Sequence, residues 1–193
     1  MIESLKPLYN ATLRPAALLC LKIGITPNHV TVGGLLFFIG AGVATAHGRW
    51  MTALILVIAG SLMDGLDGVL AREGGKTTTF GSILDSSCDR LTEMALLGGL
   101  LYYYQHSPRF SQYGPLLCYG ALCSSVMISY IKARCEGCGI SCSRGIMQRP
   151  ERLILLCAGL ISGPLVMVYV LAALLLLGTV TMFQRFVQAA RRQ

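Results

Sequence analysis

Long apolar stretches recur along this chain and limit what it can fold into. Several approach the roughly 20 residues that an α-helix needs to cross the hydrocarbon core of a bilayer. Hydrophobic residues make up 54% of the 193-residue chain, and charged residues only 13%. A soluble domain of this length cannot bury so many apolar helices inside itself. The sequence therefore predicts an all-α integral membrane protein, with one domain over residues 1–193.

Polar and turn-forming segments divide the apolar sequence into six predicted membrane spans. Residues 4–22 mix apolar positions with Lys6, Arg14 and Lys22, which is typical of an amphipathic helix at the membrane interface. Asn28 is the predicted N-cap of the first span. The tract 153–182 is too long for one ordinary span, and Gly163 with Pro164 offers a break. We expect an interfacial helix within residues 1–25 and a six-helix bundle over 26–193, with spans over 30–46, 51–72, 81–104 and 115–133 and two helices flanking the break.

Basic residues are distributed very unevenly over this layout. The side without the N-terminus holds only Arg49 and Arg109. By the positive-inside rule, the N-terminus is then cytoplasmic, and the net charge of +7 reflects topology and anionic lipid contact rather than nucleic-acid binding. The cytoplasmic side would carry Lys6, Arg14, Lys22, Arg72, Lys76, Lys132, Arg134, Arg144, Arg149, Arg152, Arg185, Arg191 and Arg192.

Three of the eight cysteines fall close together in a predicted loop. Cys135 and Cys138 have half of a zinc-site spacing, and Cys142 follows. No second pair and no nearby histidine completes a zinc site. Disulfides are not implied, because this is no small secreted scaffold. We interpret the three as incidental thiols.

All four aspartates of the chain lie within 30 residues of one another. Asp64 and Asp67 are three residues apart near the cytoplasmic end of the second predicted span, and Asp85 and Asp89 are four apart near the start of the third. Each pair therefore lies on one helix face. A short loop joins the two helices, so the two faces can meet at the same depth.

Four carboxylates within the membrane boundary repel one another and are costly to dehydrate. Arg72 and Arg90 could pair with them in a purely structural network. Oxygen-only ligands at this density instead suit hard divalent cations such as Mg²⁺ or Mn²⁺. Gly68 and Gly81 leave the helix surface bare beside the carboxylates, where a phosphate could approach.

These residues resemble the signature of the CDP-alcohol phosphotransferase family. Its eight positions are all present at the family spacing: Asp64, Asp67, Gly68, Ala71, Arg72, Gly81, Asp85 and Asp89. The resemblance extends over nearly the whole chain through a Thr-Pro-Asn turn and six spans. It implies a homodimeric membrane enzyme that transfers the phosphatidyl group of CDP-diacylglycerol to a small alcohol.

The resemblance also implies a role for each residue. Asp64, Asp67 and Asp85 would bind two divalent ions, Mg²⁺ or Mn²⁺, and Asp89 would complete the site and accept the proton of the attacking hydroxyl. The pocket for CDP would be lined by Thr26, Pro27, Asn28, Gly68, Ala71, Arg72, Thr78 and Gly81.

Several cations are expected around the cytoplasmic mouth of the same site, which favours an anionic acceptor. The runs Ser-Tyr-Ile-Lys-Ala-Arg and Arg-Pro-Glu-Arg resemble the prokaryotic phosphatidylinositol phosphate synthases within the family, which use inositol 1-phosphate. On that resemblance, the acceptor phosphate would be held by Ser129, Lys132, Arg152 and Arg185. Glycerol 3-phosphate is the alternative acceptor. A cation transporter is the alternative from another class, although such a site should be central and accompanied by broken helices or repeats.

Overall fold

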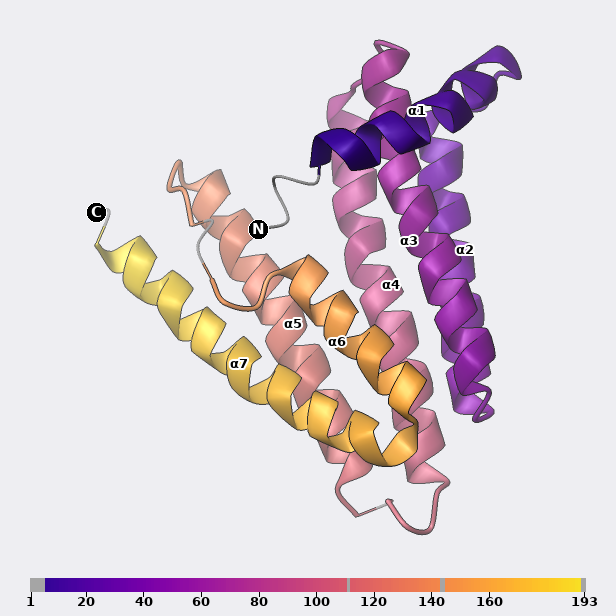
Figure 1. The fold of residues 1–193 in the computed structure, drawn as a ribbon. Coiled ribbons are helices and arrows are strands. Elements are labelled where there is room, and N and C mark those ends of the chain that lie inside the picture. Colours follow the sequence, from indigo (N-terminus) through magenta and orange to yellow (C-terminus); the bar gives the residue numbers. More distant parts are fainter. Residues whose placement is uncertain (1–5, 111, 143–144, 192–193) are drawn as a thin grey trace. The chain divides into compact units, whose positions relative to one another are not determined.

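All helices and strands that the structure describes are α-helices. This computed structural model describes residues 6–110, 112–142 and 145–191, and within these ranges it contains seven α-helices and no strand (Figure 1). Arg144 and Arg192, which were expected on the cytoplasmic side, lie outside the described residues. The helices are α1 (Lys6–Lys22), α2 (Pro27–Ala46), α3 (Trp50–Glu73), α4 (Thr79–Gln105), α5 (Gly114–Gly137), α6 (Arg149–Ser162) and α7 (Pro164–Ala190).

The chain forms two compact units. Unit 1 comprises residues 1–41 and 55–95, and unit 2 comprises residues 42–54 and 96–193. Helices α2, α3 and α4 each contribute one stretch to each unit, whereas α5, α6 and α7 belong wholly to unit 2. All four aspartates fall in unit 1, and all four residues expected to hold the acceptor phosphate fall in unit 2.

In unit 1, α1 crosses the ends of the other helices (Figure 1). Its Ala17 is fully buried against Val30 of α2 and Val69 and Leu70 of α3. Arg14 Nε forms an ion pair with a Glu73 carboxylate oxygen at 3.1 Å. Leu18, Leu19 and Ile23 remain exposed. Helix α1 is thus attached to unit 1 by one face and leaves apolar side chains uncovered.

Two glycines let α2 and α3 approach closely in unit 1. A Cβ atom placed on Gly60 would lie 2.7 Å from the Phe38 ring and 3.1 Å from the Gly34 carbonyl oxygen. A Cβ on Gly34 would lie 3.3 Å from the Gly60 carbonyl oxygen. Small residues of this kind allow helix backbones to pack tightly in membrane proteins. The Gly34–Gly60 contact therefore fixes how α2 and α3 pack.

Threonine side chains cap the two helices that lead into the aspartate region. Helix α2 begins at Pro27, and the His29 N–H donates to Thr26 Oγ1 at 3.4 Å. The predicted N-cap at Asn28 is therefore wrong, because proline at the first helical position moves the cap one residue before itself. Helix α4 begins at Thr79, and the Gly81 N–H donates to Thr78 Oγ1 at 3.0 Å.

In unit 2, α7 packs against α5 and α6. The chain reverses between α6 and α7 at Gly163, whose φ of +87° is a conformation that favours glycine. The Tyr104 hydroxyl donates to the Pro164 carbonyl oxygen at 2.6 Å, which anchors this turn to the end of α4. The predicted break at this position is confirmed.

The helix boundaries agree with the predicted spans to within a few residues, except that α5 continues to Gly137, four residues beyond its predicted end. Among the described residues, four helices are long and apolar enough to cross a membrane: α2, α3, α5 and α7. Helix α4 has the length but carries four charged residues in its first 15 residues: Asp85, Asp89, Arg90 and Glu93. Helix α6 has 14 residues, which rise only about 21 Å.

Candidate active site

Three aspartates converge in unit 1. Each of Asp64, Asp85 and Asp89 offers a carboxylate oxygen, and these oxygens all lie within 4.8 Å of one another. Asp64 comes from α3 and the other two from α4, as the spacing in the sequence predicts. Among the described residues, this is the only group of three or more potential metal-ligating side chains.

The donor set of this cluster fits a hard divalent cation. Carboxylates provide only oxygen ligands, which Mg²⁺ and Mn²⁺ accept readily. Three negative charges this close repel one another strongly unless a positive charge lies among them. No histidine or cysteine joins the group in the described part of the chain, which argues against a site built for zinc.

Asp67 lies outside that group of three and faces a pocket. Its side chain is only 6% exposed and, together with Asp85, lines a pocket of about 310 Å³. The Thr31 hydroxyl on α2 donates to Asp67 Oδ2 at 2.6 Å. The sequence pattern did not identify Thr31, because this contact depends on how α2 packs on α3.

Most of the residues expected to bind CDP line the same pocket. It is enclosed by the start of α2, the end of α3 and the start of α4, all within unit 1. Thr26 caps α2 next to these residues. The predicted residues that line the pocket are Pro27, Asn28, Gly68, Ala71, Arg72, Thr78 and Gly81.

The two glycines of the signature leave the pocket lining free of side chains at their positions. A Cβ on Gly81 would lie 3.1 Å from Thr78 Oγ1 and 3.4 Å from Asn28 Oδ1. A Cβ on Gly68 would lie 3.4 Å from a terminal nitrogen of the Arg72 guanidinium. The bare surface expected at these positions is therefore present.

Further residues that the sequence reasoning did not single out also line this pocket. Besides Thr31, these are Lys76, Thr77 and Ser82. Lys76 and Thr77 belong to the loop between α3 and α4 that the prediction treated only as a connection. Their closeness to Arg72 and Thr78 in the sequence was the available signal. With Arg72 and Lys76, the pocket presents two cations beside two aspartates.

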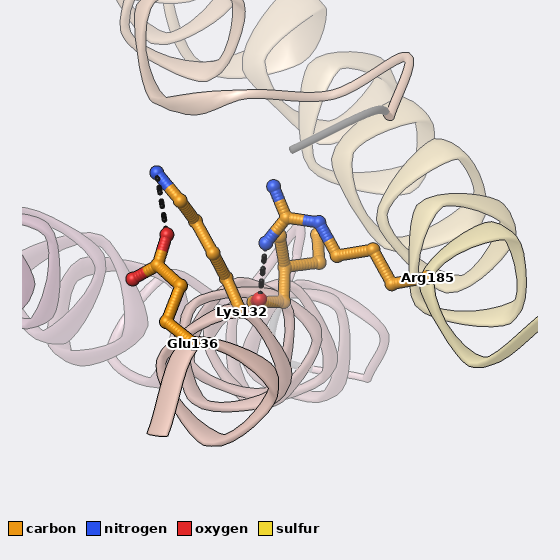
Figure 2. A network of polar contacts seen from close by, with 4 residues as sticks. Lys132, Glu136 and Arg185 are labelled. Carbon is orange, nitrogen blue, oxygen red and sulfur yellow. Dashed lines mark hydrogen bonds and ion pairs between the residues drawn. The ribbon is translucent and has the colours of Figure 1, made fainter. Parts of the chain in front are cut away.

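A second polar cluster lies in unit 2, where α5 and α7 meet. The guanidinium of Arg185 donates from α7 to the carbonyl oxygen of Ile128 on α5 (Figure 2). Ser129 follows directly on α5, and Lys132 is one turn further along the same face. Lys132 Nζ lies 3.8 Å from a Glu136 carboxylate oxygen (Figure 2). Three of the four residues expected to hold a phosphate therefore lie together.

Arg152 brings a second buried guanidinium into this cluster. Arg152 and Arg185 are each only 4% exposed, and their positive charges repel each other. Arg152 donates to the Met147 carbonyl oxygen at 3.3 Å. Arg185 Nε is buried and has no hydrogen-bond partner in the described part of the chain. A buried donor of this kind is costly unless something accepts from it, and an anion would satisfy it.

The clustered cysteines differ in burial and carry free thiols. Cys135 and Cys142 are buried beside Ile131, whereas Cys138 is exposed. All three thiols are free. Within the described residues, no third potential ligand joins Cys135 and Cys142 in a metal-sized group.

Comparison with known sequences finds one matching family and several similar proteins. A family profile described as CDP-alcohol phosphatidyltransferase matches residues 24–190. A phosphatidylinositol phosphate synthase of Mycobacterium marinum is 41% identical over 148 residues, which are 75% of this chain and 62% of that protein. An archaetidylinositol phosphate synthase of Methanothermobacter thermautotrophicus is 32% identical over 196 residues, covering 100% of this chain and 95% of that protein.

Solved structures show a similar fold. The crystal structure of Mycobacterium tuberculosis phosphatidylinositol phosphate synthase with CDP-DAG bound has a TM-score of 0.86 and 31% identity, covering 92% of each chain. The same enzyme in complex with manganese and citrate also has a TM-score of 0.86, covering 92% of this chain and 88% of that one.

Proposed function

The chain belongs to the CDP-alcohol phosphatidyltransferase family, and we propose that it transfers the phosphatidyl group of CDP-diacylglycerol to inositol 1-phosphate, releasing CMP. The observation that carries this proposal is the pocket in unit 1, where residues of the family signature surround one cavity beside the cluster of Asp64, Asp85 and Asp89. A match to the signature in sequence alone does not require a binding site, whereas here the signature residues line a pocket.

The CDP moiety occupies this pocket in our proposal. Arg72 and Lys76 supply positive charge for the pyrophosphate, and the bare surfaces at Gly68 and Gly81 let it approach the helix backbones. The N-termini of α2 and α4 both reach the pocket through Pro27, Asn28 and Thr78, and helix N-termini favour anions.

Asp64, Asp67, Asp85 and Asp89 would hold two divalent ions, Mg²⁺ or Mn²⁺. Bound there, such ions stabilise the negative charge that develops on the phosphoryl oxygens during the transfer. The manganese complex of the M. tuberculosis relative supports a divalent metal in this family. The chain's own contribution is to hold carboxylates from α3 and α4 in one place without a bulky side chain among them.

Asp89 would act as the general base. It accepts the proton of the acceptor hydroxyl, whose oxygen then bonds to the phosphorus that carries the diacylglycerol. The bond between that phosphorus and the oxygen bridging to the second phosphate breaks, and CMP leaves. Asp89 is the last acid of the signature and lies one helical turn beyond Asp85 on the same face of α4.

The acceptor's own phosphate would be bound by Ser129, Lys132, Arg152 and Arg185 in unit 2. Two buried guanidinium groups that repel each other are stabilised by an anion, and within the described residues the Nε of Arg185 has no acceptor. The ion pair of Lys132 with Glu136 is exposed and therefore weak, so Lys132 can exchange this partner for a phosphate. Glycerol 3-phosphate also carries a phosphate, whereas free inositol does not.

The names of the relatives agree on the head group and differ on the lipid. Both the M. marinum and the M. thermautotrophicus proteins are named for products that contain inositol phosphate. The first attaches it to a phosphatidyl group and the second to an archaetidyl group. We propose the phosphatidyl donor because the M. tuberculosis structure, which resembles this chain, contains CDP-DAG.

We also propose a homodimer that crosses the membrane six times, with the interfacial helix α1, both termini and the active site on the cytoplasmic side. Exposed Leu18 and Leu19, with exposed Ile23 directly after the helix, give α1 an apolar surface for the bilayer interface. The four long apolar helices would supply four spans, and α4 and α6 would supply the others.

One experiment tests the reaction and the acceptor together. Purified protein receives CDP-diacylglycerol and Mn²⁺ with inositol 1-phosphate, glycerol 3-phosphate or free inositol, and the lipid formed is identified by mass spectrometry. We expect CMP release and phosphatidylinositol phosphate with the first acceptor. Phosphatidylglycerophosphate alone would overturn the acceptor assignment. A complete lack of metal-dependent CMP release with every acceptor would favour a transporter over an enzyme.

A further inference from the structure

Thr31 on α2 contacts Asp67, one of the signature aspartates. It is 7% exposed and Asp67 is 6% exposed, and the hydroxyl donates to Asp67 Oδ2 at 2.6 Å. Hydrogen bonds to a carboxylate are shorter and stronger than those between neutral groups. Because both partners are buried, water cannot readily replace either of them.

The hydroxyl of Thr31 lies near two acceptors, a backbone carbonyl oxygen and the Asp67 carboxylate. Serine and threonine hydroxyls in helices commonly donate to a carbonyl one turn earlier, as Ser61 does to Val57 and Thr179 does to Leu175. For Thr31 the carbonyl one turn earlier is that of Pro27, whose oxygen lies 3.1 Å from Thr31 Oγ1. A hydroxyl carries one hydrogen, and the shorter contact is with the carboxylate. Thr31 is thus oriented toward Asp67.

The packing of α2 on α3 holds this pair in register. Gly34 lies one turn after Thr31, and Gly60 lies two turns before Asp67. The close backbone contact of these glycines leaves little freedom for the helices to slide. Thr31 itself lines the pocket together with Asp67 and Asp85. The packing of α2 on α3 therefore holds the Thr31 hydroxyl next to the Asp67 carboxylate.

We propose that Thr31 is a positioning residue that fixes the Asp67 carboxylate for a divalent cation, an inference that rests on the proposed function. Its hydrogen bond holds the carboxylate in one orientation, uses part of Oδ2 and leaves Oδ1 for a cation. Groups that hydrogen-bond to metal ligands fix the orientation of those ligands, and their loss typically weakens metal affinity or activity by about 10–100-fold. In this scheme Thr31 acts on the reaction through Asp67.

The test uses three variants of the full-length protein in detergent. Thr31→Val keeps the shape and removes the donor, whereas Thr31→Ser keeps the donor. Thr45→Val makes the same isosteric change at another buried threonine of α2, whose hydroxyl donates to the Gly42 carbonyl oxygen. Mn²⁺ affinity is measured by calorimetric titration without lipid substrate, and the Mn²⁺ dependence of CMP release is measured separately.

We expect the dissociation constant for Mn²⁺ to rise about 10-fold or more in Thr31→Val and to stay close to wild type in Thr31→Ser and Thr45→Val. Saturating Mn²⁺ should restore much of the turnover of Thr31→Val. Unchanged Mn²⁺ affinity in Thr31→Val, or an equal loss in Thr31→Ser, would overturn the role of the hydroxyl. Wild-type protein that binds Mn²⁺ but releases no CMP would refute the proposed reaction while leaving the positioning role standing.

Discussion

Two clusters of charged side chains carry the proposed function, one in each unit. In unit 1 the carboxylates of Asp64, Asp85 and Asp89 are brought within a few ångströms of one another, an arrangement whose repulsion a cation would offset. In unit 2 the guanidinium groups of Arg152 and Arg185 are buried together, which an anion would offset. The two clusters have opposite charge and predict ligands of opposite charge. Predictions at this scale therefore concern charge and proton transfer.

Asp89→Asn should abolish most of the turnover without unfolding the protein. Asparagine keeps the size of the side chain and an oxygen ligand but is not a base, and general bases typically contribute about 10²–10⁴-fold to rates. We expect CMP release to fall by at least about 10²-fold while CDP-diacylglycerol binding persists. The control is Glu93→Gln, one turn further along α4. Full turnover by the asparagine variant would refute the assignment of the base.

Arg185→Gln and Arg152→Gln should raise the KM for inositol 1-phosphate far more than the KM for CDP-diacylglycerol. Each lost hydrogen bond to a charged group costs about 1.5–3 kcal/mol, or about 10–150-fold in affinity. Steady-state kinetics with either substrate varied distinguishes the two effects, and exposed Arg134→Gln is the control. Because both arginines are buried, Arg152→Lys and thermal melting test for misfolding. An equal rise of both KM values would contradict a phosphate-binding role.

Contacts within one helix could be predicted from the sequence, whereas contacts between helices could not. The i,i+3 and i,i+4 spacings place Asp64 with Asp67 and Asp85 with Asp89 whatever the tertiary structure, so that part of the site was predictable. Thr31 was missed because its contact with Asp67 depends on the packing of α2 on α3. The N-cap of α2 is Thr26 and not the predicted Asn28, because Pro27 occupies the first helical position.

Gly60→Ala should destabilise the protein at the contact of α2 with α3. The added Cβ would lie 2.7 Å from the Phe38 ring, and overpacking of this kind costs about 1–3 kcal/mol. Gly40→Ala is the matched control on α2, since its Cβ would make an ordinary contact at 3.5 Å with Leu56. Melting temperatures in detergent provide the measurement. Equal stability of the two variants would show that the helices can move apart without cost.

At the scale of the whole molecule, the distribution of charge is the main constraint. Only Arg49 and Arg109 fall on the side predicted to be external. The break at Gly163 is essential to this layout, because a single helix over residues 153–182 would move the C-terminus to that side. Helix α6 has only 14 residues, fewer than the roughly 20 that cross the hydrocarbon core of a bilayer. Tyr104 anchors the turn that follows it. Six spans therefore predict that both ends of the chain lie on the cytoplasmic side.

Reporter fusions test that topology in a bacterial host. Alkaline phosphatase is active only outside the cytoplasm, so a fusion after Arg109 should be active and a fusion after Ala190 inactive. Green fluorescent protein at the same two points should show the reverse pattern. Phosphatase activity at Ala190 would contradict six spans with a cytoplasmic N-terminus.

The central claim is that the aspartates of α3 and α4 hold divalent cations. Crystals of the protein soaked in Mn²⁺ and measured at the manganese absorption edge test this most directly. We expect two anomalous peaks among Asp64, Asp67, Asp85 and Asp89, and their disappearance in Asp85→Asn. Strong peaks at other places, with none among these four carboxylates, would contradict it.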